Sequence, residues 1–300
     1  MTGNLSESLA FDVRGLNKVY PSFQLGPLDL QLPSGRVLAL VGPNGAGKTT
    51  LLNCMIGLCR GDRGQVEIFG ERNDPNETRW KHSVGYVGER HGFYQAWTGQ
   101  ANLDFLAGFY PSWSMELCLG LAQQLDLPLD KPVRDLSKGN SAKLALLAAL
   151  GHGPRLLLLD EPFSSLDPLV RASVHDILWQ FLDDGMPAIM YSTHILSDVS
   201  RLADEIVFIA NGQVQLRTDT SELTDSWRRI SFRSPSLIDD VASTFDLRRE
   251  GEAYWLLSTD GDTTRKSLEG FGITDVEVTR LSLEEIAVEI MRGGNDVASV

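Results

Sequence analysis

The first forty residues alternate short apolar and polar stretches in a pattern typical of β-strands. LAFDVRGL, FQLGPLDLQL and RVLALVG are separated by Pro and Gly. The first two change repeatedly between apolar and polar positions, which favours half-buried strands. RVLALVG, which follows, is apolar almost throughout, as a strand buried on both faces of a parallel sheet would be. We expect this strand to lead directly into the glycine-rich sequence GPNGAGKTT.

A helical insertion is predicted in the first half of the chain. TLLNCMIGLCR has the spacing of a helix, and GQVEIFG and SVGYVG return to strand character. Between Thr98 and Leu129 the pattern becomes helical again, with Thr98 as the N-cap of GQANLDFLAGFY and a second helix in SMELCLGLAQQLDL before Pro128. The sequence therefore predicts helices inserted into an α/β unit.

The α/β pattern then resumes and ends in a smaller region of different rhythm. Alternating strands and helices are predicted in RLLLLD, PLVRASVHDILWQFLDDG, PAIMYST, ILSDVSRLA and EIVFIA. Asn-Gly in IVFIANGQVQL predicts a hairpin. From about Leu223, strands are predicted in RRISFRS, AYWLLST and TDVEVTR, and helices near SLIDDVAST, TTRKSLEGF and LSLEEIAVEIM. We expect a main domain over residues 1–220, with its helical part at about 90–150, and a small α+β appendage over 223–300.

The composition and net charge of the chain disfavour some classes of binding partner. A hydrophobic share of 42% with 22% charged residues is ordinary for a folded chain. The 27 Lys and Arg against 40 Asp and Glu give a net charge of −13. This charge argues against a nucleic-acid partner and against broad electrostatic binding to an anionic lipid surface. The cysteines are Cys54, Cys59 and Cys118, without a CxxC pair, so neither a disulfide framework nor a zinc site is indicated and a reducing, cytosolic location is expected.

Membrane and secretion signals are not predicted. MTGNLSESLAFDV has neither the basic nor the apolar region of a signal peptide. No run of roughly 18 apolar residues occurs, the length that a spanning helix needs. If the protein works on a membrane, we expect another polypeptide to span it.

GPNGAGKT, residues 42–49, fits the pattern G-x-x-x-x-G-K-[ST] between a predicted strand and helix, which is the context of a P-loop. Its glycines let backbone N–H groups turn toward a phosphate, Lys48 reaches the β and γ oxygens of a nucleotide, and the Thr49 hydroxyl binds Mg²⁺. The alternative is a glycine-rich turn with a chance lysine. The predicted nucleotide-binding residues of this segment are Gly42, Pro43, Asn44, Gly45, Ala46, Gly47, Lys48, Thr49 and Thr50.

RLLLLDEP ends a buried strand in two adjacent carboxylates. Strand ends of this kind face the ligand-binding edge of α/β folds. Asp160 suits a place among the Mg²⁺ ligands, and Glu161 would polarise a water for in-line attack on the γ-phosphate. The alternative is an exposed acidic turn before Pro162.

RDLSKGNSAKLALLAAL leads from a polar turn into an apolar helix, with Ser137 where an N-cap would lie. A capped core helix is the simpler interpretation. The same hydroxyl and the free N–H groups of a helix N-terminus can also bind phosphate, so the segment alone leaves a cap and an anion site open.

Taken in order, these motifs resemble the nucleotide-binding subunit of ATP-binding-cassette (ABC) transporters, from about Leu9 to Thr218. GPNGAGKTT resembles the Walker A motif, LLLLDEP the Walker B motif, LSKGN the signature, SSLD the D-loop and STH the switch-histidine segment. The resemblance implies an α/β P-loop NTPase fold (ABC ATPase) with N-terminal antiparallel strands, a helical subdomain that bears the signature, and a small C-terminal α+β appendage. It also implies that two such domains pair head to tail, with each ATP between the Walker motifs of one and the signature of the other.

The resemblance assigns further roles by position. Tyr20 would stack on adenine, although a buried strand aromatic is the alternative. His194 would contact the γ-phosphate beside Glu161, and Glu89 would take the place of the family's usual glutamine and approach Mg²⁺. The implied contacts with the partner copy's nucleotide come from Ser137, Gly139, Asn140 and Asp167. Where the family most often has LSGGQ, this chain has Lys138 and Asn140.

ERHGFYQAWTGQANLDF and LSKGN are most similar to ATPases of ABC-2-type exporters. This resemblance implies an ATPase that dimerises around two MgATP, drives a separate membrane permease, and lies in the cytoplasm, peripheral on the inner face of the membrane. A non-transport ABC ATPase acting on ribosomes or DNA is the alternative, and the single P-loop, the lack of a heptad run and the acidic charge disfavour it. A regulatory cassette without turnover is disfavoured because Lys48, Asp160, Glu161 and His194 are all present.

Overall fold

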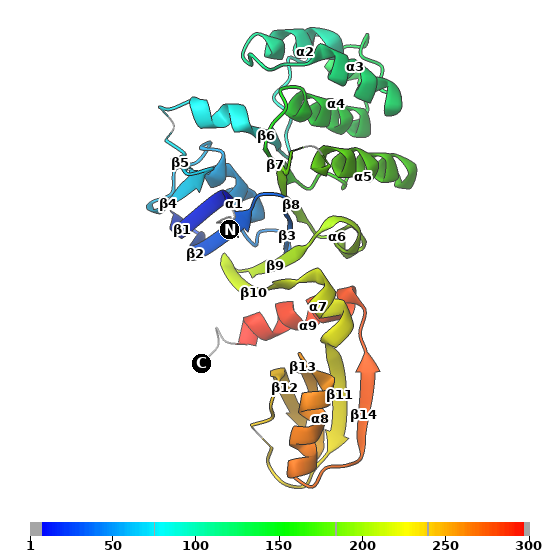
Figure 1. Ribbon diagram of the computed structural model, residues 1–300. Helices are drawn as coiled ribbons and strands as arrows, with labels where there is room; N and C mark the ends of the chain where they lie inside the picture. Colours follow the sequence, from blue (N-terminus) through cyan, green and yellow to red (C-terminus); the bar gives the residue numbers. More distant parts are fainter. Residues whose placement is uncertain (1–7, 75, 184, 239, 297–300) are drawn as a thin grey trace, which may run out of the picture. The chain divides into compact units, whose positions relative to one another are not determined.

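Two sheets and their helices form the first of two units into which the chain divides (Figure 1). The computed structural model describes residues 8–74, 76–183, 185–238 and 240–296. The first unit ends at Val214, and the second begins at Gln215. Among the described residues, no helix combines the length and the apolar character needed to cross a membrane.

The N-terminal sheet is antiparallel, with strand order β2-β1-β4-β5. Its strands are β1 (Leu9–Tyr20), β2 (Phe23–Pro33), β4 (Arg63–Ile68) and β5 (Glu71–Arg72). From Leu28 to Leu32, β2 alternates buried and exposed side chains, because one face of the sheet packs on the core while the other meets solvent.

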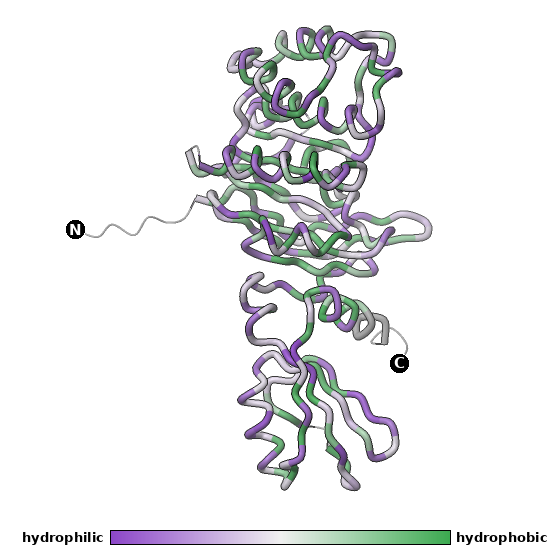
Figure 2. Tube along the Cα trace, turned by 90° about the vertical axis from the view of Figure 1, so that its right-hand side faces the viewer, coloured by the Kyte–Doolittle hydropathy of each residue, from purple (hydrophilic) through white to green (hydrophobic). Residues whose placement is uncertain are grey.

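The second sheet has strand order β10-β9-β3-β8-β7-β6, and β9, β3, β8, β7 and β6 run parallel. Its strands are β3 (Val37–Val41), β6 (Val84–Val87), β7 (Leu156–Asp160), β8 (Ala188–Thr193), β9 (Glu205–Ala210) and β10 (Gln213–Asp219), and the boundary between the units falls within β10. Every residue of β3, β7 and β8 is buried. Hydrophobic stretches run through the middle of the first unit (Figure 2), as expected for a sheet covered on both faces.

One hydrophobic core joins the two sheets through α1 (Lys48–Met55). Leu51, Leu52 and Met55 of this helix are buried among side chains from both sheets. The helix that follows the glycine-rich loop is therefore fixed along its length, and its N-terminus is held at the edge of the parallel sheet.

The predicted helical insertion is present as three capped helices, α2 (Gly99–Ala107), α3 (Met115–Gln124) and α4 (Lys138–Leu150). Thr98, Ser114 and Ser137 cap them in turn, each accepting a backbone N–H bond. The remaining helical segments of this unit are η1 (Arg79–Ser83), η2 (Val133–Asp135), α5 (Pro168–Leu182) and α6 (Leu196–Leu202).

The second unit is a four-stranded antiparallel sheet with its own core. The strand order is β12-β13-β11-β14, and the core is built around Ile230, Tyr254, Leu256 and Leu268. The elements are α7 (Thr220–Ser226), β11 (Arg228–Arg233), β12 (Thr244–Glu250), β13 (Ala253–Ser258), α8 (Gly261–Gly270), β14 (Val276–Arg280) and α9 (Leu283–Asp296).

One helix expected in this unit was predicted wrongly. SLIDDVAST contains no helix among its described residues, and β12 and α7 were not predicted. Ile238 and Val241 are both buried in the core of the unit. Their separation by three residues resembles the spacing of a helix, but here it belongs to a loop that is held at two points. The Tyr254 and Ser267 hydroxyls accept hydrogen bonds from the N–H groups of Ile238 and Ala242, which replaces the bonds that a helix would have supplied.

Candidate functional site

The carboxyl ends of four neighbouring parallel strands bring the predicted site residues to one edge of the sheet. In space these strands follow the order β3-β8-β7-β6. Val41 lies beside Thr193, Asp160 beside Ser192, and Val87 beside Leu159. The segments that follow these strands carry the glycine-rich loop, His194, Glu161 and Glu89. Ligands of open α/β sheets bind at such an edge.

The glycine-rich loop depends on conformations that glycine tolerates best. Gly47 has φ 108° and caps α1 in the left-handed region. A Cβ on Gly42 would lie 2.2 Å from the backbone oxygen of Ile209. Beside Gly45, φ 81°, a Cβ would meet open space, and the Thr49 side chain is exposed at the start of α1. The loop thus leaves open space beside Gly45 and an exposed hydroxyl at a helix N-terminus, a suitable place for a phosphate.

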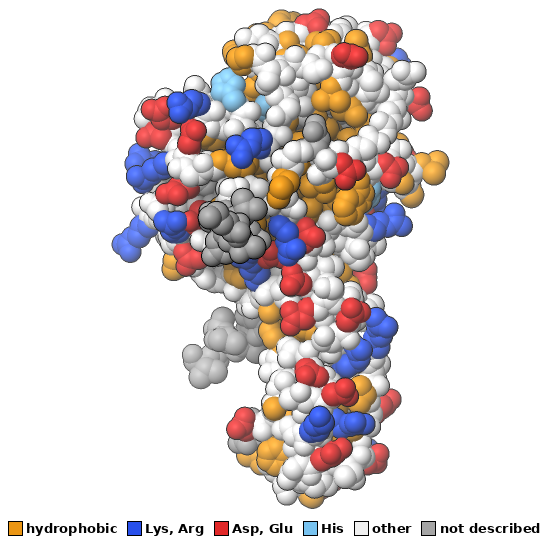
Figure 3. Space-filling model, in the orientation of Figure 1, with side chains coloured by type: hydrophobic (Ala, Val, Ile, Leu, Met, Phe, Trp, Pro, Cys, Tyr) orange, Lys and Arg blue, Asp and Glu red, His pale blue; other side chains and the backbone are white. Residues whose placement is uncertain are grey.

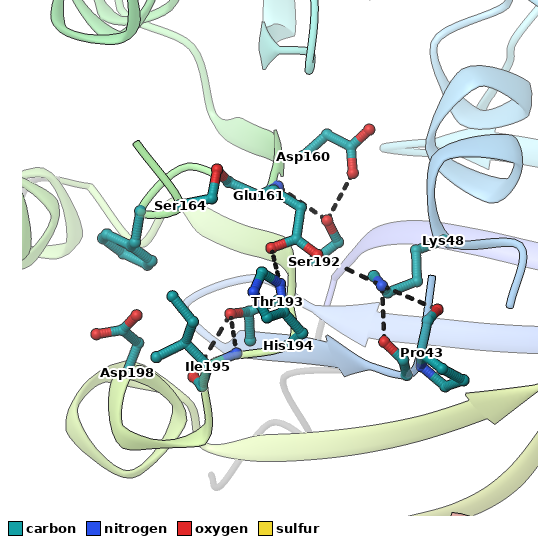
Figure 4. A network of polar contacts seen from close by, with 12 residues as sticks. Pro43, Lys48, Asp160, Glu161, Ser164, Ser192, Thr193, His194, Ile195 and Asp198 are labelled. Carbon is teal, nitrogen blue, oxygen red and sulfur yellow. Dashed lines mark hydrogen bonds and ion pairs between the residues drawn. The ribbon is translucent and has the colours of Figure 1, made fainter. Parts of the chain in front are cut away.

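Lys48 is buried, with 6% of its surface exposed, and its ammonium lies among three acceptors. Nζ donates to the backbone oxygens of Gly42 at 2.7 Å and Pro43 at 3.3 Å, and it lies 3.4 Å from Oε1 of Glu161. An ammonium has three donors, so all of them have an acceptor nearby. Figure 4 shows Glu161 between Lys48 and His194.

Glu161 joins the lysine to the histidine. Its Oε2 lies 2.8 Å from Nδ1 of His194, and its backbone N–H donates to Oγ of Ser192 at 2.9 Å. The residue has φ 51°, a conformation that is uncommon outside glycine and is often found at functional sites. A carboxylate beside an exposed histidine at the end of a sheet can accept a proton from a water molecule.

Asp160 has one carboxylate oxygen that lacks a partner. The residue is 2% exposed, and Oδ1 accepts a 2.6 Å hydrogen bond from Oγ of Ser192. Oδ2 is buried without any hydrogen bond, an arrangement that costs free energy unless a cation is bound there. An orphaned carboxylate oxygen beside a phosphate-binding loop fits Mg²⁺, whose preferred ligands are oxygens.

Glu89 lies two residues beyond β6 with its side chain exposed. The pKa of Tyr86 is raised to about 12, first by burial and then by the negative charges of Asp160 and Glu89. Both carboxylates are therefore near the same phenol, whose hydroxyl donates to Oδ1 of Asn53 on α1 at 3.2 Å.

Tyr20 lies at the end of β1 with 40% of its surface exposed, so it is not a buried strand aromatic. Its ring stacks with Phe23 at a centroid distance of 6.5 Å, and its hydroxyl lies 3.4 Å from Sγ of Cys59. This hydrogen bond, followed by burial, raises the pKa of Tyr20 to about 12. Phe23 in turn lies close to the glycine-rich loop, since a Cβ on Gly47 would be 2.9 Å from its ring.

The signature residues do not reach Lys48 within one chain. Ser137 is exposed and accepts from the N–H of Asn140 at 3.2 Å. A Cβ on Gly139 would lie 3.2 Å from the backbone oxygen of Ser165. Asp167 caps α5. Over the described part of the chain, no hydrogen bond or ion pair joins residues 137–140 or Asp167 to Lys48.

Two contributors to the site were missed by the sequence analysis. Ser192 holds both Asp160 and the backbone of Glu161, and the one available signal was a polar residue within a buried strand. Phe23 packs against Gly47. Its place at the start of β2 gave no indication of this contact, which forms between distant parts of the sequence.

Comparison with known proteins places this geometry in a family. A family model described as "ABC transporter" matches residues 25–164. A lantibiotic transport ATP-binding protein of Streptococcus pyogenes is 31% identical over 65% of this chain and 84% of its own length. An uncharacterized ABC transporter ATP-binding protein of Synechocystis is 34% identical over 63% of this chain and 55% of its own length. A bacitracin transport ATP-binding protein of Enterococcus faecalis is 33% identical over 65% of this chain and 64% of its own length. The chain therefore spans less than two thirds of either of these last two relatives.

Solved structures agree on the fold. The ATP-binding subunit of an ABC transporter superposes with a TM-score of 0.65 and 29% identity, over 71% of this chain and 91% of that one. A dimeric ATP-binding cassette bound to ADP and phosphate gives a TM-score of 0.64 at 21% identity, over 70% of this chain and 98% of that one. The P-loop fold class predicted from the sequence is confirmed.

Proposed function

The chain belongs to the family of ABC transporter ATP-binding proteins, and on this premise we propose that it hydrolyses ATP to drive a separate exporter permease. Two copies close around two MgATP, and closure and reopening perform the work on the permease. The contact of Glu161 with both Lys48 and His194 carries this proposal. These three groups meet where the γ-phosphate of a nucleotide on the glycine-rich loop would lie.

The nucleotide is held by the loop from Gly42 to Thr50, and its adenine stacks on Tyr20. The ammonium of Lys48 exchanges its present acceptors for the β and γ oxygens, because a dense negative charge outcompetes backbone carbonyls. Thr49, Asp160 and Glu89 would hold Mg²⁺, which would supply positive charge to neutralise the phosphate oxygens.

Hydrolysis follows from the placement of Glu161 and His194. When the phosphate takes over Lys48, Glu161 is released from that ion pair and can orient a water in line with the γ-phosphorus. As the water oxygen bonds to the γ-phosphorus, the bond from this phosphorus to the β,γ-bridging oxygen breaks and ADP leaves. One proton of the water moves to a carboxylate oxygen of Glu161, and His194 holds both the carboxylate and the phosphate in place. The hydroxyl of the product phosphate is supplied by this water.

The second half of each site comes from another copy of the chain or from a paralogous cassette. Ser137, Gly139 and Asn140 present a hydroxyl and helix N–H groups that their own chain leaves outside the Lys48 cluster. Asp167 lies at the start of the neighbouring α5. A γ-phosphate bound by the second copy would complete these donors, and the dimeric cassette among the structural neighbours supports the arrangement.

The permease is proposed to dock beside Glu89, between the sheet and the inserted helices. A cavity of about 450 Å³ lies there, lined among others by Tyr86, Arg90, Tyr94, Phe105 and Tyr110. Hydrophobic side chains are exposed over the helical part of the first unit (Figure 3), and Tyr94 and Phe105 are among them. An apolar cavity suits a short helix of a membrane partner.

The exporter class and the cellular place rest on the relatives. Proteins named for bacitracin and lantibiotic transport support the ABC-2-type exporter that the sequence predicts. The ATPase domain would cover residues 1–220 and the accessory domain 223–300, peripheral on the cytoplasmic face of the membrane. A ribosome- or DNA-acting cassette has no support from these relatives and is disfavoured by the net charge of −13.

Glu161→Gln tests this function. The amide keeps the size of the side chain but cannot accept the proton, so MgATP binding should remain while steady-state hydrolysis falls on the order of 100-fold or more. Glu116→Gln, an exposed position on α3, is the matched control and should hydrolyse ATP like the wild type. A wild type without hydrolysis, or normal turnover by Glu161→Gln, would contradict the proposal.

A further inference from the structure

Behind the site lies a buried polar cluster that the proposed mechanism does not use. His175 and Arg171 come from α5, and Asp198 comes from α6. Nε2 of His175 lies 3.2 Å from Oδ1 of Asp198, and an Arg171 guanidinium nitrogen lies 3.8 Å from Oδ2. Asp198 is 2% exposed and His175 5%. The cluster thus ties two helices together with a charge in the protein interior.

Burying a carboxylate this deeply costs folding free energy unless a positive charge or hydrogen-bond donors compensate its charge. The Asp198 Oδ2 atom has no hydrogen bond, so the nearby Arg171 supplies most of the compensation on that side. An apolar residue pair of similar volume would hold two helices together at no such cost. The charged arrangement therefore points to a requirement for defined geometry beyond packing.

One arm of the cluster reaches the segment of Glu161. The His175 ring stacks on Phe163 with a centroid distance of 4.4 Å and an angle of 12°. Arg171 donates to the Phe163 backbone oxygen at 3.4 Å. The Ser164 hydroxyl donates to the Glu161 backbone oxygen at 3.0 Å. The turn from Glu161 to Ser164 is thus anchored on α5.

The other arm reaches the segment of His194. Asp198 lies in the first turn of α6, and its backbone N–H donates to Ile195, the residue after His194. The hydroxyl of Tyr191, on the strand that leads to His194, donates to the backbone oxygen of Asp198 at 3.3 Å. Asp198 therefore fixes the turn between β8 and α6, from which His194 projects (Figure 4).

The two arms and the contact between His194 and Glu161 form a closed ring. At the surface, the two side chains are 2.8 Å apart. Inside, they are connected through Phe163, His175 and Asp198. We propose that Asp198, with His175 and Arg171, is a positioning residue that sets the spacing between the segments carrying Glu161 and His194. This inference rests on the proposed ATPase function. The cluster touches no part of the glycine-rich loop over the described residues, so it acts on hydrolysis and leaves ATP binding unchanged.

The test compares kcat with KM in the chain of 300 residues. Asp198→Asn keeps the volume of the side chain and removes its charge. A misplacement of a reacting group costs one to two orders of magnitude, so kcat for ATP should fall on the order of tenfold while KM and the Kd for MgATP change less than about twofold. His175→Phe keeps a ring against Phe163 but loses the bond to Asp198, and a smaller fall in kcat is expected.

Two control variants separate positioning from stability. Val174→Ala removes buried methyl groups from the same helix and should lower the melting temperature without changing kcat at a temperature where the protein is folded. Asp176→Asn changes an exposed carboxylate of α5 and should change neither.

The outcomes are distinguishable from failure of the proposed function. Wild type without ATP hydrolysis would overturn the function itself, and this inference with it. A hydrolysing wild type with an equally fast Asp198→Asn variant would overturn the positioning role alone. A parallel loss of MgATP affinity, or the same loss of kcat in Val174→Ala, would also overturn it. If Asp198→Asn does not fold, the kcat of His175→Phe decides by the same criteria.

Discussion

Glu161 combines a left-handed backbone with contacts to both Lys48 and His194. For a residue that is not glycine, φ 51° costs about 1–3 kcal/mol. The surrounding hydrogen bonds from Ser164 and to Ser192 hold it there. Strain of this kind at the end of a central strand indicates that the Glu161 carboxylate must point in a defined direction.

The motif residues could be recognised from sequence because each has a fixed type at a fixed offset. Lys48, Asp160 and His194 lie where those patterns place them, at one sheet edge. Ser192 and Phe23 could not be recognised, because their roles arise from contacts between segments that are distant in sequence. The same holds for Asp198, whose partners lie 23 and more residues earlier.

The three cysteines are predicted to differ sharply in reactivity. Burial raises the pKa of Cys54 to about 12 and that of Cys118 to about 11, so at pH 8 their thiolate fraction is on the order of 0.1% or less. Cys59 is only half-buried. A thiol reagent such as DTNB should therefore label one cysteine rapidly in the native protein, and the other two only in denaturant.

Cys59→Ser provides the control for this labelling experiment. The fast phase should disappear in that variant while the slow phase persists. A fast phase that survives the substitution would show that a second thiol is accessible in the native fold.

At the scale of elements, the N-terminus of α4 is proposed to act both as a cap and as a ligand site. Ser137→Ala should cost about 1 kcal/mol of folding free energy and also weaken MgATP-induced dimerisation, because the hydroxyl would contact the partner's phosphate. Ser114→Ala removes the same kind of cap from α3 and should cost a similar free energy without any effect on dimerisation.

Thermal unfolding and sedimentation of both variants separate the two roles. Equal effects of Ser137→Ala and Ser114→Ala on dimerisation would contradict a ligand role for Ser137. A loss of dimerisation confined to Ser137→Ala is the expected result.

Element prediction succeeded where periodicity and local chemistry agreed. Thr98 and Ser137 cap their helices as expected, and Asn211-Gly212 forms the predicted hairpin turn with positive φ at both residues. It failed at SLIDDVAST, where Ile238 and Val241 are buried in a loop at the spacing that a helix would give. The strand order of the central sheet follows from pairing across long separations, which a single sequence does not encode locally.

At the scale of the whole molecule, the proposal is that one chain supplies half of each complete site. The Walker-type residues and the signature belong to one unit, but no hydrogen bond or ion pair joins them in its described part. The second unit has an independent core, and no chemistry is assigned to it. ATP hydrolysis is therefore expected to require two chains.

Sedimentation of the Glu161→Gln variant tests this requirement most directly. Without nucleotide it should sediment as a single chain of 33.1 kDa. With saturating MgATP it should shift to a species of twice that mass that contains two bound nucleotides. A variant that binds MgATP and remains a monomer at concentrations up to the high micromolar range would contradict the requirement for two chains.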